Sequence, residues 1–423
     1  MSISSNMQQE KAHEFERAKK ILQLKQLPPP KPESFIHIPE SGNYTEKGRR
    51  ERLECLTKDL QKNVDHLSGS KHFDDPGLLK GNIEHFIGMA QIPVGIAGPM
   101  LVNGTEASGA YYVPLATTEG ALVASYARGM RACRESGYIT SVCLIESVQR
   151  SPIFRFNSIT DMGQFAIWIM DKLPVFTELV KKVTRHGMLK DMSLNLEGNN
   201  LTVTFEYFTG DAAGQNMVTI CTDHICHFIV EQAPVKPKQW FLESNYSGDK
   251  KATALSFTNV RGKKVTAEIV LPKEIVHKVL KSTPALMTDY WRTSTISVVQ
   301  SGAIGAQGHI ANGIAAIFIA CGQDVACVSE ASIGITRMEL TENNDLYATV
   351  TLPGLIVGTV GGGTSLPTQR ECLELLDCFG SGKARKFAEI CGAMILAGEI
   401  SIAAALASGH FSQAHAIFGR KNT

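Results

Sequence analysis

The chain has 423 residues, of which 43% are hydrophobic and 20% charged, and its formal net charge is +1. One small core cannot organise a chain of this length, so two or three domains are expected. The balanced charge argues against nucleic acid or a membrane surface as a partner, so an anionic substrate would need a local cluster of cations.

The first 70 residues are predicted to form an N-terminal arm and a helical region. The arm is polar and ends in three prolines at 28–30, and leucines at helical spacing predict a helix over 45–67. No charged start followed by an apolar run opens the chain, and its ten cysteines include no C-x-x-C pair. We therefore expect a soluble, cytoplasmic protein with reduced thiols, most of them buried.

Residues 152–242 contain a distinct succession of predicted strands and helices. A short strand, a helix over 158–185 that Pro174 would kink or split, a hairpin, a second helix over 213–232 and a closing strand follow one another. This β-α-β-β-α-β order is typical of a ferredoxin-like unit. We predict a small domain over 152–242, inserted into a large domain formed by 71–151 and 243–423.

The large domain is predicted to be mixed and rich in helices, which makes the chain α+β. A small-residue helix should begin near Thr118, a strand should cover 265–271, and long helices should cover 302–320 and 385–409. The stretch 388–409 is long enough to span a bilayer. Two glutamates interrupt it and alanine and glycine dominate it, so a helix buried in the protein core is expected.

The most informative segment is the loop 245–251, which contains Asp249, Lys250 and Lys251. Adjacent lysines on an irregular loop point in different directions. One could polarise a carbonyl and stabilise an oxyanion, the other could grip a carboxylate, and Asp249 could hold one ammonium in place. Such a triplet is also the usual composition of a solvated surface turn.

Three other residues are candidates for acid–base chemistry. Glu119 lies among small and apolar residues and could donate a proton near neutral pH, or it could simply favour a helix N-terminus. Asp324 follows a very apolar helix and must be paired, most naturally with a lysine, in a catalytic network or a structural ion pair. His415, on the C-terminal tail, could protonate a leaving thiolate, and spacing does not exclude His410 instead.

Glycine-bearing turns at 210–216 and 358–364 would let the backbone approach a phosphate closely, although neither has the G-x-G-x-x-G pattern that follows a strand. Cysteines and histidines cluster at 221–227 within a predicted helix, where four ligands cannot converge on one ion. We therefore predict no metal site.

Six segments, in this order, resemble the 3-hydroxy-3-methylglutaryl-CoA (HMG-CoA) reductase family. They are IPVGIAGP (92–99), ATTEG (116–120), GDAAGQNM (210–217), DKK (249–251), CGQD (321–324) and GTVGGGT (358–364). The resemblance runs from about residue 81 to the C-terminus. The tail resembles the biosynthetic, class I enzymes more than those that degrade mevalonate.

The resemblance implies a role for each candidate. Lys250 would stabilise the oxyanion, and Glu119 would deliver a proton. Asp324 would tune that pair, and His415 would protonate the departing CoA. The family positions that bind the hydroxymethylglutaryl group are matched by Arg150, Lys251, Arg292 and Asn312. The positions that contact CoA are matched by Ser125 and Arg128.

The resemblance also implies NADPH as cofactor and HMG-CoA as substrate. Thr184 and Arg185 match the position that meets the 2′-phosphate, where the fork of an arginine suits phosphate. The glycine turns would contribute Asp211, Ala213, Asn216, Gly361 and Gly362. A homodimer or larger even assembly, with the active site between subunits, is implied as well.

Two positions depart from the family pattern. Glu84-His85 stands where Glu-Asn is usual, and Lys421 stands where the animal enzymes carry a phosphorylatable serine. Two other functions stay open: oxidation of mevalonate with NAD by the same fold, and a non-catalytic CoA-binding scaffold. The tail and Arg185 argue against the first, and the presence of all four catalytic candidates argues against the second.

Overall fold

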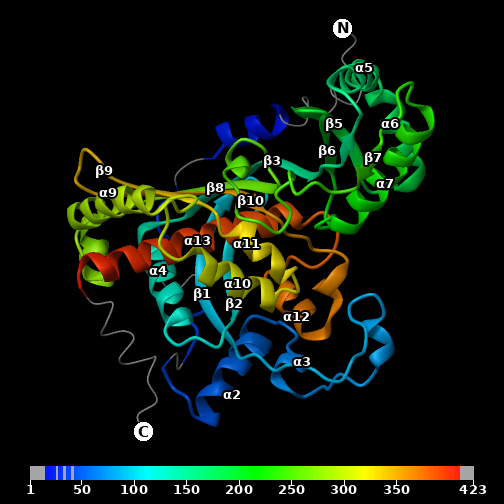
Figure 1. The fold of residues 1–423 in the computed structure, drawn as a ribbon. Helices are drawn as coiled ribbons and strands as arrows, with labels where there is room; N and C mark the ends of the chain where they lie inside the picture. Colours follow the sequence, from blue (N-terminus) through cyan, green and yellow to red (C-terminus); the bar gives the residue numbers. More distant parts are fainter. Residues whose placement is uncertain (1–14, 25–26, 32–34, 40–41, 410–423) are drawn as a thin grey trace.

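The computed structural model describes residues 15–24, 27–31, 35–39 and 42–409. Its helices and strands form an α+β architecture with a large body and a smaller lobe (Figure 1). His415, and with it the predicted tail chemistry, lies outside the described residues.

Ten strands of the described chain form one sheet in the order β7-β4-β6-β3-β8-β10-β9, with β1 joined to β2 and β3, and β5 joined to β6. They are β1 (Val94–Gly104), β2 (Ser108–Ala116), β3 (Ile139–Arg150), β4 (Ile153–Arg155), β5 (Met188–Glu197), β6 (Asn200–Phe208), β7 (Gln239–Phe241), β8 (Gly262–Leu271), β9 (Ile335–Leu340) and β10 (Leu346–Leu355). β3 links the two parts of the molecule, because its body pairs with β8 and its last three residues pair with β6.

Besides a helix over residues 15–22, the described chain has twelve further α-helices. They are α2 (Glu46–Glu54), α3 (Asp65–Ser68), α4 (Leu122–Ser136), α5 (Ile159–Met170), α6 (Leu173–Val183), α7 (Gln215–Gln232), α8 (Lys273–Ile275), α9 (Pro284–Ser301), α10 (Ile310–Ala320), α11 (Val328–Ala331), α12 (Pro367–Leu375) and α13 (Ala384–Ala407).

The smaller lobe contains β4 to β7 and α5 to α7 (Figure 1). Its strands are antiparallel in the order β7-β4-β6-β5. The predicted hairpin and both helices are confirmed. Pro174 does split the first helix: α5 ends at Met170, and the proline occupies the first turn of α6.

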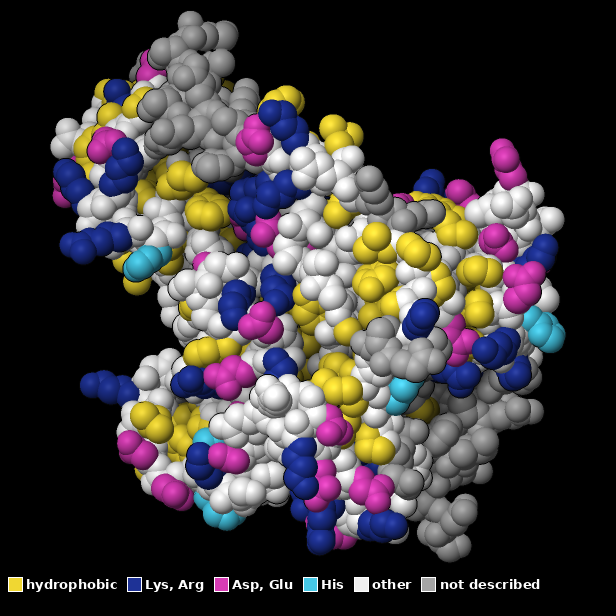
Figure 2. Space-filling view, turned by 180° about the vertical axis from the view of Figure 1, so that it is seen from behind, with side chains coloured by type: hydrophobic (Ala, Val, Ile, Leu, Met, Phe, Trp, Pro, Cys, Tyr) yellow, Lys and Arg dark blue, Asp and Glu magenta, His cyan; other side chains and the backbone are white. Residues whose placement is uncertain are grey.

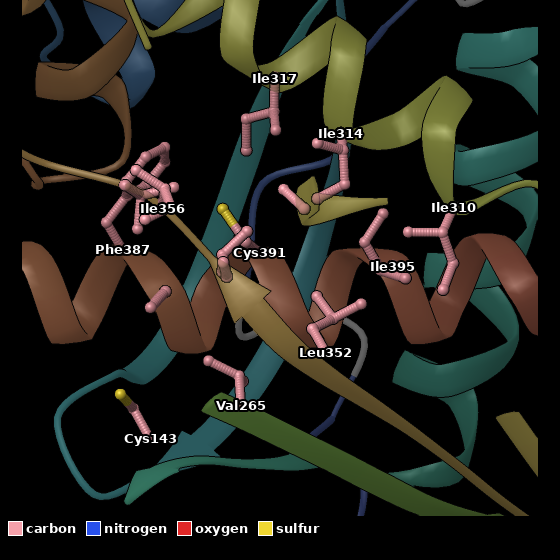
Figure 3. Close-up of a cluster of buried hydrophobic side chains, with 14 of the residues drawn as sticks. Cys143, Val265, Ile310, Ile314, Ile317, Leu352, Ile356, Phe387, Cys391 and Ile395 are labelled. Carbon is pink, nitrogen blue, oxygen red and sulfur yellow. The ribbon is translucent and has the colours of Figure 1, made fainter. Parts of the chain in front are cut away.

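Helix α13 forms the centre of the large body. Its side chains Phe387, Cys391 and Ile395 lie between α10 and the strands β8 and β10 (Figure 3). In the described chain α13 is the one helix apolar and long enough to cross a membrane, and 83% of its most apolar window is buried. A Cβ added at Gly129 of α4 would collide with the carbonyl of Ala397. The predicted core helix, packed closely through small residues, is therefore confirmed.

Three sequence-based helix predictions are wrong in their extent. The helix predicted over 302–320 begins only at Ile310, because Gly302 adopts a left-handed conformation and ends α9 instead. The helix expected near Thr118 begins at Leu122, after the left-handed Ala121. The helix over 45–67 breaks after a π-helical turn, where Gln61 has a φ of 53°.

A buried carboxylate joins α13 to the turn between β1 and β2. Glu389 is fully buried and accepts hydrogen bonds from the hydroxyl of Thr105 and from the backbone N–H groups of Glu106, Ala107 and Cys143. Burial raises the pKa of Glu389, although these donors oppose the effect.

This raised pKa predicts a pH-dependent difference between the wild type and Glu389→Gln. A raised folded-state pKa means that the contribution of Glu389 to stability is complete below its unfolded pKa and is lost as pH rises. The wild type should therefore lose stability relative to the variant from about pH 4 upward, and each kcal/mol should change Tm by at most about 2–4 °C in a chain of this length. Thermal unfolding across this range measures the difference, and a constant Tm difference would contradict the prediction.

A candidate active site around Lys250

Lys250 lies in the loop 245–251 and forms an ion pair with Asp324. The Lys250 Nζ is 3.0 Å from Asp324 Oδ2, and both side chains are partly exposed. Asp324 follows α10, as expected, and also accepts a hydrogen bond from the N–H of Ala326 at 3.0 Å. The hydrogen bond with Asp324 raises the pKa of Lys250, so its ammonium stays charged across the physiological range. Lys250 therefore presents a charged ammonium at the surface, held in place by Asp324.

The role expected for Asp249 is wrong. Its carboxylate is bound by Arg150 (3.0 Å) and by Arg261 rather than by either neighbouring lysine. Burial would raise the pKa of Asp249, but the charges of Arg261 and Arg150 outweigh it and hold this pKa below its usual value. Lys251 is exposed and donates to the backbone carbonyl of Asp249 at 2.9 Å. The two lysines thus have different partners, as the loop geometry suggested.

Two residues that the sequence did not single out lie beneath this loop. Glu330 of α11 and Arg261 are almost fully buried, and Glu330 Oε2 is 2.7 Å from Arg261 Nε. Burial raises the pKa of Glu330, and the charge of Arg261 opposes this shift. The sequence held one signal for Glu330, a carboxylate among small and apolar residues. Nothing in the sequence distinguishes Arg261 from a surface arginine.

Glu119 lies in a second cluster. It is exposed, it precedes α4, and its carboxylate accepts a hydrogen bond from Asn312 Nδ2 at 3.3 Å. The apolar surroundings expected for Glu119 are therefore absent within the described chain. Asn312 belongs to the first turn of α10, whereas Asp324 follows the end of this helix. From Asn312 to Ala320 the helix rises roughly 12 Å, at about 1.5 Å per residue. The chain thus separates Glu119 from the Lys250–Asp324 pair.

The two glycine turns of the sequence lie against each other. The N–H of Thr359 donates to the carbonyl of Asp211 at 2.8 Å, and a Cβ at Gly358 would lie 2.6 Å from the backbone nitrogen of Ala213. The Asp211 carboxylate accepts the N–H groups of Gly382 and Ala384, at the start of α13. The Asp211 carboxylate therefore links the turn at 210–216 to the start of α13.

The remaining cofactor candidates lie around these turns. Gly361 and Gly362 are exposed, have positive φ angles, and have no atom within 4 Å of an added Cβ. Asn216 is exposed in the first turn of α7, which begins after the left-handed Gly214 without a side-chain cap. Arg185 is exposed just beyond the end of α6, and the Thr184 hydroxyl accepts the N–H of His186.

The candidates for binding the rest of the substrate are dispersed. Arg128 donates to the hydroxyl and carbonyl of Ser401, and Ser125 bonds to the same hydroxyl at 3.0 Å. Burial lowers the pKa of Arg128. Arg128 and Ser125 thus attach α4 to α13 through Ser401. Arg292 is exposed on α9, and Arg150 is buried and bound by Glu243 as well as Asp249.

Cysteines and histidines give no metal site in the described chain. No three His, Cys, Asp or Glu side chains of that part converge on one point, and every cysteine is free and buried.

From behind, the molecule is hollowed between the smaller lobe and the large body, with lysine and arginine side chains in the waist (Figure 2). These cationic side chains suit the binding of an anionic molecule.

The α+β fold, the adjoining glycine turns and the exposed lysine–aspartate pair together define a site suited to the reduction of a carbonyl group. Residues 48–420 match the family described as Hydroxymethylglutaryl-coenzyme A reductase, and the chain belongs to this family.

Similar proteins agree with this assignment. The chain is 43% identical to 3-hydroxy-3-methylglutaryl-coenzyme A reductase of Pyrococcus abyssi, over 87% of this chain and 92% of that protein. It is also 43% identical to the enzyme of the same name from Methanocaldococcus jannaschii, over 82% and 87% of the two chains.

Solved structures share the fold at much lower identity. The 3-hydroxy-3-methylglutaryl-coenzyme A reductase of Streptococcus pneumoniae has a TM-score of 0.70 at 20% identity, with 88% of this chain and 99% of that chain covered. A structure of the class II enzyme from the same organism, bound to NADPH in open conformations, has a TM-score of 0.69 at 21% identity. At such identity these structures support the fold alone.

Proposed function

We propose that this chain reduces (S)-3-hydroxy-3-methylglutaryl-CoA to mevalonate and CoA with NADPH, in the mevalonate pathway of isoprenoid biosynthesis. Reduction of HMG-CoA is the activity of the family to which the chain belongs. The observation that carries our assignment of residues is the Lys250 ammonium, which lies 3.0 Å from Asp324 and is open to solvent.

NADPH, when bound, supplies the hydride for each of two successive reductions. Lys250 would donate a hydrogen bond to the oxyanion that forms as the thioester carbonyl carbon gains a hydride. When this oxyanion collapses, the C–S bond breaks and the sulfur leaves as a thiolate, which we assign His415 to protonate. The aldehyde is reduced at the same position, and Glu119 would deliver the proton that completes the alcohol. Asp324 would hold the ammonium in place and charged throughout.

The residues around the glycine turns fit NADPH. The exposed Gly361 and Gly362 leave the backbone accessible, and the uncapped start of α7 leaves N–H groups free to donate to phosphate. We assign the 2′-phosphate to Arg185 and Thr184. Asp211 and Ala213 would shape this site, and Asn216 would contact the cofactor directly.

Replacing Arg185 with alanine is expected to raise the KM for NADPH about tenfold and to leave the KM for NADH unchanged, because a charge-assisted bond to phosphate is lost. Lys181 provides the matched control, since it lies near the same end of α6 and is already paired with Glu178 at 2.7 Å. Lys181→Ala should leave both KM values unchanged. An equal rise for the two cofactors in Arg185→Ala would contradict the assignment.

The acyl group and CoA would be held by the cationic and polar residues of the loop and the surrounding helices. We assign the hydroxymethylglutaryl group to Arg150, Lys251, Arg292 and Asn312, and the CoA contacts to Ser125 and Arg128. Arg128 and Ser125 already share Ser401, which supports a surface at the α4–α13 contact that is fixed before the substrate binds.

We propose that the complete site forms between two copies of the chain, in a homodimer or a larger even assembly. Within one chain, α10 separates the Glu119–Asn312 cluster from the Lys250–Asp324 pair. One carbonyl cannot contact both ends of this helix. A partner that places its Glu119 beside Lys250 would complete the site.

The segment 81–93 also supports a site shared between two copies of the chain. Ile83, Ile87 and Met89 are exposed large hydrophobic residues on it, and Ile87 is fully exposed. An apolar segment that nothing in the described chain covers is typical of an interface. His85, the departure from the family pattern, has a φ of 52°, a left-handed conformation in which asparagine and histidine are both enriched.

We propose that residues 152–242 are a ferredoxin-like NADP-binding domain, that 71–151 with 243–423 form the substrate domain, and that 1–70 form the N-terminal region. The strand order β7-β4-β6-β5 and the alternation of helices and strands support the first assignment. The burial of α13 supports a soluble protein, which we place in the cytoplasm.

The test of this function is the absorbance of NADPH or NADH incubated with HMG-CoA and the purified chain. Oxidation of NADPH that depends on HMG-CoA, with mevalonate and CoA as products, is expected. Efficient reduction of NAD by mevalonate, with little use of NADPH, would favour the degradative reaction. A folded protein that binds CoA and oxidises neither cofactor would favour a scaffold.

A further inference from the structure

Lys250 has a backbone conformation that its neighbours must maintain. Its φ is 55°, in the left-handed region that a residue with a Cβ rarely adopts. Its backbone N–H donates to Glu330 Oε1 at 3.2 Å. The side chain, by contrast, is 45% exposed and is held at its far end by Asp324. Where the ammonium can reach therefore depends on where the backbone of Lys250 is anchored.

Glu330 is suited to be this anchor because it is itself immobilised. It is 2% exposed, and its second carboxylate oxygen is 2.7 Å from Arg261 Nε. Each oxygen thus has its own partner, the backbone of Lys250 for Oε1 and a buried guanidinium for Oε2. A buried ion pair with two fixed ends sets distances more precisely than an exposed one does.

Arg261 extends the anchor to the residues on either side of the site. It binds the Asp249 carboxylate, next to Lys250, and donates to the carbonyl of Gln149 at 3.1 Å. It also donates to the side-chain oxygen of Gln215 at 2.9 Å, and Gln215 is the first residue of α7. One buried guanidinium therefore connects the lysine loop to the helix start that we assign to the cofactor.

We propose that Glu330, oriented by Arg261, is the positioning residue that places Lys250 against the substrate carbonyl. The proposal rests on the proposed function, because it assigns Glu330 a role that acts only through Lys250. It differs from a purely structural ion pair in what it predicts: loss of Glu330 should lower the rate of the chemical steps, not only the stability of the fold.

The experiment compares Glu330→Leu and Glu330→Gln with the same substitutions at Glu389. Glu389 is a matched control, since it is also buried and also accepts backbone N–H groups, at 2.8 and 2.9 Å. Leucine removes the acceptor for the Lys250 N–H and the charge beside Arg261. Glutamine keeps an acceptor and removes the charge. Each variant is assayed below its thermal midpoint, and kcat and the KM values for NADPH and HMG-CoA are measured. The assay is then repeated with the aldehyde intermediate as the substrate.

Glu330→Leu is expected to lower kcat on the order of 100-fold, since small misplacements of a catalytic group have effects of this size. Glu330→Gln should lower it less, and the KM for NADPH should stay within about twofold of wild type because no cofactor contact is lost. Reduction of the aldehyde should fall by the same factor, since both carbonyls would use the same ammonium. The Glu389 variants should keep kcat, whether or not their thermal midpoints differ from that of the wild type at the assay pH.

Three results would overturn the proposal: an unchanged kcat in Glu330→Leu, an equal loss of kcat in the Glu389 variants at equal loss of thermal midpoint, or a KM for NADPH that rises as kcat falls. If Glu330→Leu does not fold, Glu330→Gln decides by the same criteria. A wild type that does not oxidise NADPH with HMG-CoA would overturn the proposed function itself, before any variant is compared.

Discussion

Lys250→Ala should lower kcat by roughly 10²–10³-fold, the usual effect of removing one donor to a developing oxyanion. The fold should persist. The side chain is 45% exposed, and Asp324 is the only ion-pair partner found for it within the described residues. Partly exposed pairs of this kind stabilise a fold by about 0–1 kcal/mol. Steady-state kinetics with NADPH and HMG-CoA, together with the thermal midpoint, measure both expectations.

The neighbouring lysine provides the comparison for this variant. Lys251→Ala removes a charge from the same loop, and we assign Lys251 to substrate binding, so the KM for HMG-CoA should rise more than kcat falls. If Lys251→Ala lost kcat and Lys250→Ala lost only affinity, the two roles would have to be exchanged. A kcat for Lys250→Ala within tenfold of wild type would remove it from the chemistry.

Two inactive variants should restore activity when they share a dimer. A heterodimer of Glu119→Gln and Lys250→Ala contains one site with both lesions and one site with neither, so about half of the wild-type activity per dimer is expected. The physical reason is the length of α10, which keeps the two groups apart within one chain. Co-expression with two affinity tags, followed by purification on both, isolates the heterodimer for assay.

The control is a heterodimer of Lys250→Ala and Asp324→Asn. These residues contact each other within one chain at 3.0 Å, so each site of the heterodimer keeps one lesion and no activity should return. Restoration in the control, or no restoration in the Glu119–Lys250 pair, would contradict a site shared in this way. A monomeric enzyme with full activity would contradict it as well.

Local patterns predicted much of the smaller lobe. The hairpin of β5 and β6, the break at Pro174 and helix α7 follow from alternation, from proline geometry and from apolar spacing over a few residues. Helix α13 was predicted for the same reason. The strands β3, β9 and β10 and the helices α9 and α12 were not predicted. Strand β10 does alternate, and every second residue from Leu346 to Leu352 is buried, so its pattern was present in the sequence. Strand β9 and helix α9 mix polar and apolar residues, and only the tertiary contacts show which of their faces is buried.

The contacts of the candidate site were also predictable from the sequence only in part. The sequence showed that Asp324 needs a cationic partner, and motif order placed Lys250 and Glu119 among the reacting groups. It could not rank the cations available to Asp249, because Arg150 and Arg261 reach it from β3 and from the residue before β8. It likewise gave Glu330 no partner, because the two ends of a buried ion pair are distant in the chain.

Motifs and periodicity depend on residues close together along the chain, so the sequence identified the family and many local elements, but not the bounds of three helices. Only the folded chain shows that Lys250 pairs with Asp324, that the Asp249 carboxylate binds two arginines, and that Glu119 contacts Asn312 at the opposite end of α10 from Asp324. Burial, competition between charges and the length of an intervening helix are properties of the folded chain, and no local pattern encodes them.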